Sequence, residues 1–228
     1  MKQTVFWDFD GTLVYCNQSF LDALQQALQE KQCETDRECC ARFLQEASSW
    51  NHPEESYIGR TGECWWTDLQ DKIKIFLDSI HVSLNVQNEI CEMFRKNAIS
   101  YSYHIYEDAT EILEKTKRNG VSNYIISNNF PELIQTIEKM GISRYFEDVF
   151  LSANIGYEKP RAEIFQYALQ QTGQPEMAYM VGDNPAADIQ GAAAVGMRTI
   201  MVHGTAPVAD AEYTCRSLIE IQDILQLQ

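Results

Sequence analysis

Two aspartates, Asp8 and Asp10, follow an apolar run near the start of the chain, in the segment TVFWDFDGTLVY. Side chains alternate along an extended chain, so residues two apart point to the same side. Both carboxylates are therefore expected to project beyond the carboxyl end of a buried strand, where open α/β sheets bind ligands. Two like charges this close repel each other unless a cation lies between them or one holds a proton. Taken alone, the pair could also be a solvated strand end.

Polar side chains follow three later apolar segments as well. Each has an ordinary structural explanation by itself, such as a turn cap, a surface lysine or an exposed helical acid. Together they indicate one site, because the carboxyl ends of parallel strands share one edge of a sheet. Hydroxyl, amide and lysine groups suit phosphate oxygens, and carboxylates suit a cation. The residues are Ser127, Asn128 and Asn129 in IISNN, Lys159 in GYEKP, and Asp183 and Asp188 in VGDNPAAD.

The elements that must position these residues alternate between strand and helix from about residue 103 onward. Apolar runs predict strands at 4–8, 121–128, 148–153, 177–183 and 197–202. Helical periodicity predicts helices at 107–120, 131–141, 161–173, 185–196 and 217–227. In the first of these helices, Ala109, Ile112, Leu113 and Thr116 fall on one face. The pattern predicts an α/β fold whose parallel sheet carries helices on both faces.

The intervening segment has a different character. Between Asn17 and about Ser102 the signals are helical, at 19–31, 36–50, 64–80 and 86–98. We interpret this segment as an all-helical subdomain inserted after the first strand, with hinges near Tyr15 and near residues 101–104. The predicted division is a core of residues 1–14 and 103–228 and a helical insertion of residues 15–102.

The order DFDGTL, ISNN, KP and GDNPAAD resembles the haloacid dehalogenase superfamily of hydrolases, and the insertion looks like its α-helical cap. The resemblance implies a Rossmann-like core, a Mg²⁺ ion and an aspartyl-phosphate intermediate. It makes Asp8 the nucleophile and Asp10 the general acid/base. Ser127 and Lys159 would bind the phosphoryl group, and Asp183 and Asp188 would join Asp8 and Asp10 around the metal.

Physical chemistry is consistent with these roles. Covalent catalysis splits hydrolysis into two easier steps, and Mg²⁺ and Lys159 would offset the charge of the phosphoryl group. Gly11 permits a tight turn, so backbone N–H groups at Gly11 and Thr12 could face the phosphate, with Asn128 beside them. The expected function is a magnesium-dependent phosphatase for a small phosphomonoester: a sugar phosphate, a phosphoacid or a nucleoside monophosphate.

Three other functions remain open. A phosphomutase or phosphotransferase would share the same core residues. A dehalogenase, as the resemblance implies, would lack an aspartate at the position of Asp10. A silent binding module would have lost turnover, which the intact acidic residues and Lys159 do not favour.

Substrate specificity is expected to come from the cap and its hinges. Tyr15, Asn17, Arg60 and Trp65 are the candidate substrate contacts. The alternative is that Trp65 and its neighbour Trp66 pack the interior of the cap and that Arg60 is an ordinary surface charge.

Composition limits the partners and the compartment. A net charge of −15 argues against nucleic acid and anionic membranes, because these need a basic face. We find no apolar run of about 18 residues, no secretory signal, no zinc-type spacing of histidines and no C-x-x-C among seven cysteines. The expectation is a cytoplasmic protein with reduced thiols. The oligomeric state stays open.

Overall fold

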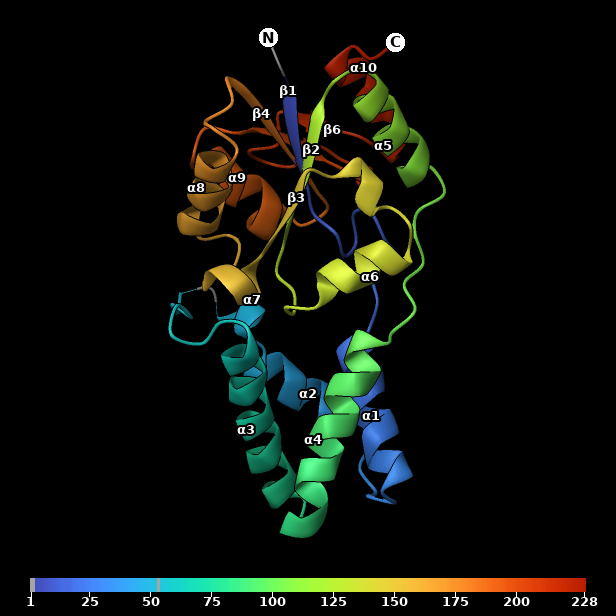
Figure 1. Ribbon diagram of the computed structural model, residues 1–228, viewed down its shortest axis with the longest axis vertical. Coiled ribbons are helices and arrows are strands. Elements are labelled where there is room, and N and C mark those ends of the chain that lie inside the picture. Colours follow the sequence, from blue (N-terminus) through green and yellow to red (C-terminus); the bar gives the residue numbers. More distant parts are fainter. Residues whose placement is uncertain (1–2, 53) are drawn as a thin grey trace.

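The computed structural model describes residues 3–52 and 54–228, except for the side chain of Trp50. Its ribbon has two parts, a sheet flanked by helices and a group of helices beyond one edge of that sheet (Figure 1). The C-terminus lies at the far end of the part that contains the sheet. Within the described ranges, no helix combines the length and the apolar character needed to cross a membrane.

One six-stranded parallel sheet forms the core, in the order β3-β2-β1-β4-β5-β6. The first strand is central, because Thr4 pairs with Ser122 on one side and with Ala178 on the other. A strand at the start of the chain thus pairs with strands more than a hundred residues away, as the sequence predicts. The strands are β1 (Gln3–Trp7), β2 (Ser122–Ser127), β3 (Asp148–Leu151), β4 (Met177–Gly182), β5 (Arg198–Met201) and β6 (Tyr213–Thr214).

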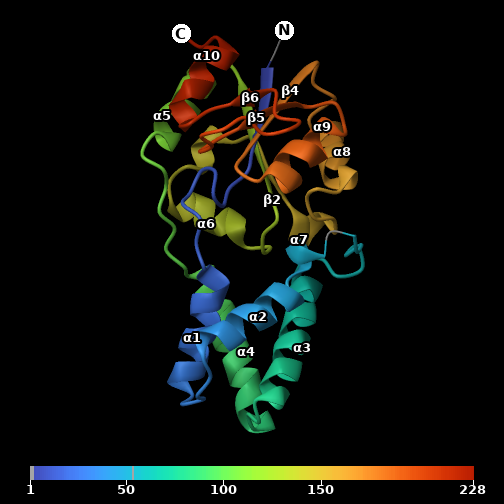
Figure 2. The same ribbon diagram turned by 180° about the vertical axis from the view of Figure 1, so that it is seen from behind.

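Helices cover both faces of the sheet. On one face, Val5 and Trp7 pack in a buried cluster with residues of α5 (Ala109–Arg118), α6 (Leu133–Lys139) and α10 (Ile221–Leu225). On the other face, Phe6 packs with residues of α8 (Ala162–Gln171) and α9 (Gly191–Ala193). Figures 1 and 2 show α5 and α10 on one side of the sheet and α8 and α9 on the other. The α/β fold with two helical layers is confirmed.

Helix α5 illustrates how the sequence pattern determines burial. Ala109, Ile112, Leu113 and Thr116, which share one face at helical spacing, are its buried residues. Gly120 follows the helix with φ +73°, a conformation that costs glycine little.

Four helices form the inserted part, which we call the cap: α1 (Ser19–Glu30), α2 (Arg37–Ala47), α3 (Glu63–Ser79) and α4 (Leu84–Ile99). All four were expected from the sequence. Trp66 is buried among the rings of Phe20, Phe94 and Phe130, and Trp65 lies edge-on to it. Both tryptophans therefore pack inside the molecule.

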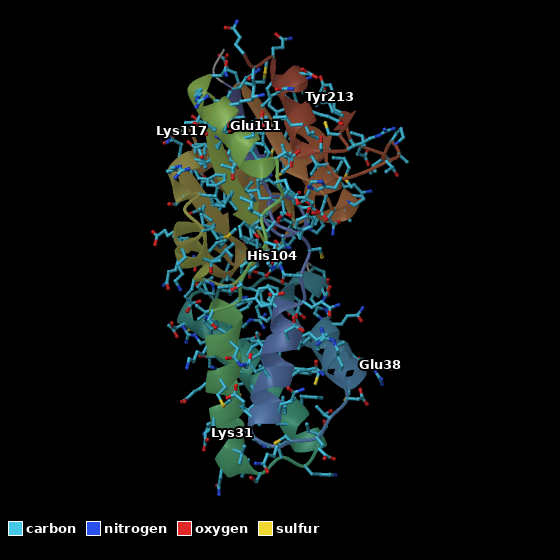
Figure 3. All side chains as sticks on the ribbon, turned by 90° about the vertical axis from the view of Figure 1, so that its right-hand side faces the viewer. Lys31, Glu38, His104, Glu111, Lys117 and Tyr213 are labelled. Carbon is cyan, nitrogen blue, oxygen red and sulfur yellow. The ribbon has the colours of Figure 1, made fainter. Side chains whose placement is uncertain are left out.

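Two neighbouring chain segments connect the cap to the core. Val14 and Ile105 form an antiparallel bridge. The Tyr15 N–H donates to the His104 carbonyl at 2.8 Å, and the Tyr106 N–H donates to the Leu13 carbonyl at 3.0 Å. Figure 3 shows His104 at the level where the two parts meet. The chain thus leaves and re-enters the core at adjacent points.

The structure differs from the sequence expectations at three short elements. The helix expected at 185–196 begins as a π-helical turn, η3 (Pro185–Gln190), which the Asn184 side chain caps by accepting the Ala186 and Ala187 N–H groups. Strand β3 ends at Leu151 and the single-turn α7 (Ser152–Ile155) follows. Strand β6 pairs only two residues, too few for periodicity to indicate it. The 3₁₀ turns are η1 (Ser49–Asn51), η2 (Ser143–Tyr145) and η4 (Leu218–Glu220).

Candidate active site

The strand ends of the core converge on a cavity of about 750 Å³ between the sheet edge and the cap. Asp8 directly follows β1, Ser127 ends β2 and Asp183 directly follows β4. Lys159, from the loop before α8, and Asp188, from η3, complete the core side of the cavity. Strands that are neighbours in the sheet thus deliver residues from distant parts of the sequence to one place.

Three carboxylates come together at this edge. Asp8, Asp183 and Asp188 each offer an oxygen, and these oxygens all lie within 4.8 Å of one another. Burial, followed by the charge of Asp8, raises the pKa of Asp183. A cation between the carboxylates would remove this repulsion. Hard oxygen donors in this number suit Mg²⁺, so the residues present fit the ion that the sequence implies.

Two glycines allow the carboxylates to pack this closely. A Cβ atom on Gly11 would lie 2.4 Å from Asp183 Oδ2, and Gly11 also has φ +86°. A Cβ atom on Gly182 would lie 2.3 Å from the carboxyl group of Asp188. Any side chain at either position would displace a carboxylate.

Lys159 supplies the positive charge of the site. Its side chain is 3% exposed, and its Nζ donates to Asp8 Oδ1 and to Asp188 Oδ1, both at 2.6 Å. Burial disfavours the charged amine, but the carboxylates of Asp188 and Asp8 outweigh burial and raise the pKa of Lys159. The lysine therefore stays charged.

Asn128 fixes the backbone that carries this lysine. The Asn128 Nδ2 donates to the Lys159 carbonyl at 3.0 Å, and the Lys159 N–H donates to Asn128 Oδ1 at 2.7 Å. Asn128 lines the cavity, but its amide is already used in this reciprocal pair.

Asp10 lies in a different environment from Asp8. Asn17 Nδ2 donates to Asp10 Oδ1 at 2.7 Å, and Asn129 Nδ2 donates to Asp10 Oδ2 at 2.6 Å. Burial, followed by the charge of Asp8, raises the pKa of Asp10 to about 7, against the effect of the two amides. Its carboxylate is not among the three that come together, so the structure does not group Asp10 with the expected metal ligands.

Of the remaining core residues predicted to bind phosphate, Ser127 lines the cavity, whereas Gly11 and Thr12 do not. Ser127 lines the cavity, and its hydroxyl oxygen has a long contact of 3.5 Å with Asn129 Nδ2. The Thr12 hydroxyl is fully buried and lies 3.2 Å from Asp8 Oδ2 and 3.0 Å from Asp183 Oδ1. Thr12 therefore supports the two carboxylates with its side chain, leaving only its backbone for a phosphate. Neither Gly11 nor Thr12 is among the described residues that line the cavity.

Of the four candidate cap contacts, the structure brings only Asn17 to the cavity. Tyr15 is exposed and its hydroxyl donates to Glu107 at 2.8 Å. Arg60 pairs with Asp68 at 2.9 Å and lies over the Tyr57 ring. The alternative reading of Arg60 as a surface charge and of Trp65 as a packing residue fits these positions better. The side chain of Trp50, another aromatic residue of this segment, lies outside the described part of the chain.

The structure adds contacts that the sequence reasoning did not assign. Asn129 holds Asp10, although its place after β2 was noted. Glu158 accepts a hydrogen bond from Ser49 of η1 at 2.7 Å, and Trp65 Nε1 lies 3.4 Å from the same serine oxygen. No sequence signal indicates Ser49, because its role depends on where the cap lies against the core.

Comparison with known proteins agrees with this architecture. The sequence model of the haloacid dehalogenase-like hydrolases matches residues 2–196. A structure of YfnB from Bacillus subtilis superimposes with a TM-score of 0.75 at 17% identity and covers 99% of each chain. The parallel sheet, the helical cap, the cluster at the sheet edge and the family match lead to one conclusion. The chain belongs to the haloacid dehalogenase-like hydrolases.

Several curated proteins share part of the sequence. Phosphoserine phosphatase of Thermus thermophilus is 36% identical over 44% of this chain and 41% of its own length. Haloacid dehalogenase-like hydrolase domain-containing protein 3 of mouse is 28% identical over 72% of this chain and 66% of its own. Ribulose-1,5-bisphosphate 5-phosphatase of Halopiger xanaduensis is 28% identical over 88% and 84%. The match thus spans less than two thirds of the first two relatives.

Proposed function

We propose that the protein is a magnesium-dependent phosphatase that hydrolyses a small phosphomonoester through an aspartyl-phosphate at Asp8. The observation that carries the proposal is the placement of Asp8, Asp183 and Asp188 around Lys159 at the carboxyl edge of the sheet. The names of the relatives support it. They include a phosphoserine phosphatase, a glyceraldehyde 3-phosphate phosphatase and a pyrimidine 5'-nucleotidase.

Asp8 is the proposed nucleophile. A carboxylate oxygen attacks phosphorus, the bond to the leaving oxygen breaks, and water then hydrolyses the acyl phosphate to release inorganic phosphate. Lys159 offsets the charge of the phosphoryl group from within hydrogen-bonding distance of Asp8. Ser127 offers a hydroxyl on the same side of the cavity.

Asp10 is the proposed general acid and base. With a pKa of about 7, it can hold a proton for the leaving oxygen and later accept one from the attacking water. Asn17 and Asn129 hold both of its oxygens, so the carboxyl group keeps a fixed orientation. Because Asn17 lies at the start of the cap, the position of the cap affects this group directly.

Asp8, Asp183 and Asp188 are the proposed ligands of Mg²⁺. The ion would neutralise charge on the phosphoryl oxygens when bound. We further propose residues 15–102 as a unit that opens and closes over the cavity, hinged where the two connecting segments pair. All seven cysteines are free, which supports a reducing compartment such as the cytoplasm.

The decisive experiment combines one substrate and two variants. p-Nitrophenyl phosphate should release inorganic phosphate with Mg²⁺ present, and a chelator should stop the release. Asp8→Asn should lower kcat by about a thousandfold or more, because the amide cannot attack phosphorus. Asp71→Asn, which changes an exposed acid of α3, is the matched control and should keep full activity.

Three results would contradict the proposal. They are hydrolysis by the Asp8→Asn variant at the unmodified rate, hydrolysis that continues at the same rate after a chelator is added, and no hydrolysis by the unmodified protein. Phosphate transferred to a second hydroxyl of the substrate, with none released, would indicate a mutase instead.

A further inference from the structure

The cavity has two chemically different sides. Its floor is the sheet edge, where four aspartates and Lys159 lie. Its roof comes from the start of the cap and from α2, and Figure 2 shows α2 in the upper part of the cap, below the sheet. A phosphate bound on the floor places its leaving group under the roof. The roof therefore determines which leaving groups fit.

Charged side chains are missing from the roof among the residues that the structure describes. Lys159 is the one lysine or arginine lining the cavity there, and both of its carboxylate partners belong to the floor. The polar residues of the cap that line the cavity are neutral amides and hydroxyls, Asn17, Gln18, Ser19, Gln45, Ser48 and Asn51, and Tyr103 lies beside them. Such groups both donate and accept hydrogen bonds, which matches hydroxyl and carbonyl groups of a ligand.

Nearby arginines do not supply the missing charge. Arg37 reaches Gln18 from outside the cavity, but it also pairs with Asp22 at 2.7 Å. Arg60 pairs with Asp68 and Glu55. Arg95 pairs with Glu63 and Glu132. Each of these cations already has a carboxylate partner.

The floor would repel a second anion. Four carboxylates lie there with one lysine, so Lys159 and a bound divalent cation leave no spare positive charge on the floor, and the bound phosphate makes the floor net negative. A carboxylate or second phosphate on the leaving group would stay unpaired in this field and lose its water. Unpaired charge is an effective means of rejecting a ligand.

We infer that the leaving group of the substrate is polar and uncharged, of the polyol, sugar or nucleoside kind, and that leaving groups with a carboxylate or phosphate are rejected. The inference rests on the proposed phosphatase function and narrows its substrate class. A cavity of about 750 Å³ has room for a leaving group of this size beside the phosphate.

Two matched pairs of substrates test this inference. Glycerol 3-phosphate and 3-phosphoglycerate differ only in a hydroxymethyl group in place of a carboxylate, and so do glucitol 6-phosphate and 6-phosphogluconate. For the unmodified protein with Mg²⁺, kcat/KM should be at least about tenfold higher for the neutral member of at least one pair. Equal values, higher values for the acids, or no turnover of any of the four would overturn the inference.

A gain-of-function variant makes the test independent of substrate shape. Gln45 is exposed, lines the roof and belongs to α2, so Gln45→Lys places a cation there with little strain. The ratio of kcat/KM for the acid to that for its neutral partner should rise at least threefold. Gln29→Lys, on an exposed position of α1 outside the lining, adds the same charge and should leave the ratio unchanged.

Failure of the inference and failure of the proposed function are distinguishable. If p-nitrophenyl phosphate is hydrolysed while the acids are favoured or Gln45→Lys has no effect on the ratio, the phosphatase proposal stands and the inference falls. If p-nitrophenyl phosphate and all four substrates are left intact, both fall.

Discussion

Gly11 and Gly120 share a left-handed backbone but differ in their surroundings. A Cβ atom on Gly11 meets the Asp183 carboxylate, whereas one on Gly120 meets nothing within 4 Å. Gly11→Ala and Gly120→Ala should each lose about 1–2 kcal/mol of unfolding free energy from backbone strain. Only Gly11→Ala should also weaken Mg²⁺ binding, by tenfold or more, because it displaces Asp183.

Calorimetric titration with Mg²⁺ measures that affinity, and denaturant unfolding measures the stability. If Gly120→Ala weakened Mg²⁺ binding as much as Gly11→Ala, crowding at Asp183 would not be the cause.

Glu158 is a buried acid between core and cap. Its side chain is 1% exposed, Oε1 accepts from Ser49, and Oε2 has no hydrogen-bond partner in the structure. Burial raises the pKa of Glu158 above the usual 4.5, although the side chains of Ser49 and Ser152 and the charge of Lys159 oppose this. Between 4.5 and the raised value, the folded protein binds more protons than the unfolded chain. This group therefore makes the folded state less stable as pH rises through that window.

Glu158→Gln removes this titration. Its Tm relative to the unmodified protein should increase from pH 5 to pH 8, measured by thermal unfolding in matched buffers. Glu176→Gln, an exposed position, is the control and should show a constant difference. A constant difference for Glu158→Gln too would contradict the raised pKa.

Motif residues at strand ends were predictable one by one, whereas their partners were not. Asp8, Ser127 and Asp183 follow buried strands, and parallel strands bring their carboxyl ends to one edge whatever the loops do. Asn17 was expected to meet the substrate, yet it holds Asp10. This contact depends on how the cap lies on the core, which no periodicity in the sequence encodes.

Among the elements, α3 and α4 hold the cap against the core through one glutamate. Trp66 Nε1 donates to Glu132 Oε2 at 2.7 Å, and Arg95 Nη2 donates to Glu132 Oε1 at 2.6 Å. Glu132 directly precedes α6 of the core. These bonds are a second link between the two parts of the molecule, in addition to the contact of Glu158 with Ser49.

Glu132→Ala removes both bonds at once. Cleavage by chymotrypsin at the connecting segments near Tyr15 and Tyr101 should become at least threefold faster, because the open state gains population. Glu63→Ala removes the other partner of Arg95 but lies within the cap, so it should change the rate little. Equal acceleration in both variants would show that this contact does not hold the cap.

How well each helix or strand could be predicted depends on how many residues repeat its pattern. The helical face of α5 and the long helices of the cap repeat their pattern over several turns, which makes them recognisable. Strand β6 has two paired residues, and the π-helical turn of η3 has no counterpart in the helical periodicity of the sequence. Trp65 was placed on the correct helical segment, but neither Trp65 nor Arg60 is among the described residues that line the cavity.

At the scale of the whole molecule, metal binding should be visible as stability. Mg²⁺ at about 100 times its Kd should stabilise the folded state by about 2.7 kcal/mol, which raises Tm by about 5–10 °C. A chelator should reverse the shift. Asp183→Asn should nearly abolish it, while Asp71→Asn should keep it.

This measurement needs no turnover, so it separates metal binding from catalysis. The same shift in Asp183→Asn as in the unmodified protein would place the ion elsewhere among the 33 acidic residues of the chain.

The paired segments at Val14 and Ile105 have a consequence for the architecture of the chain. The chain leaves the core and returns to it at this one junction, and the described residues between, 15–52 and 54–102, contribute no strand to the sheet. A foreign module whose own ends lie a few ångströms apart could be spliced there. The sheet and the aspartates at its edge would be kept, and only the cap above them would be replaced.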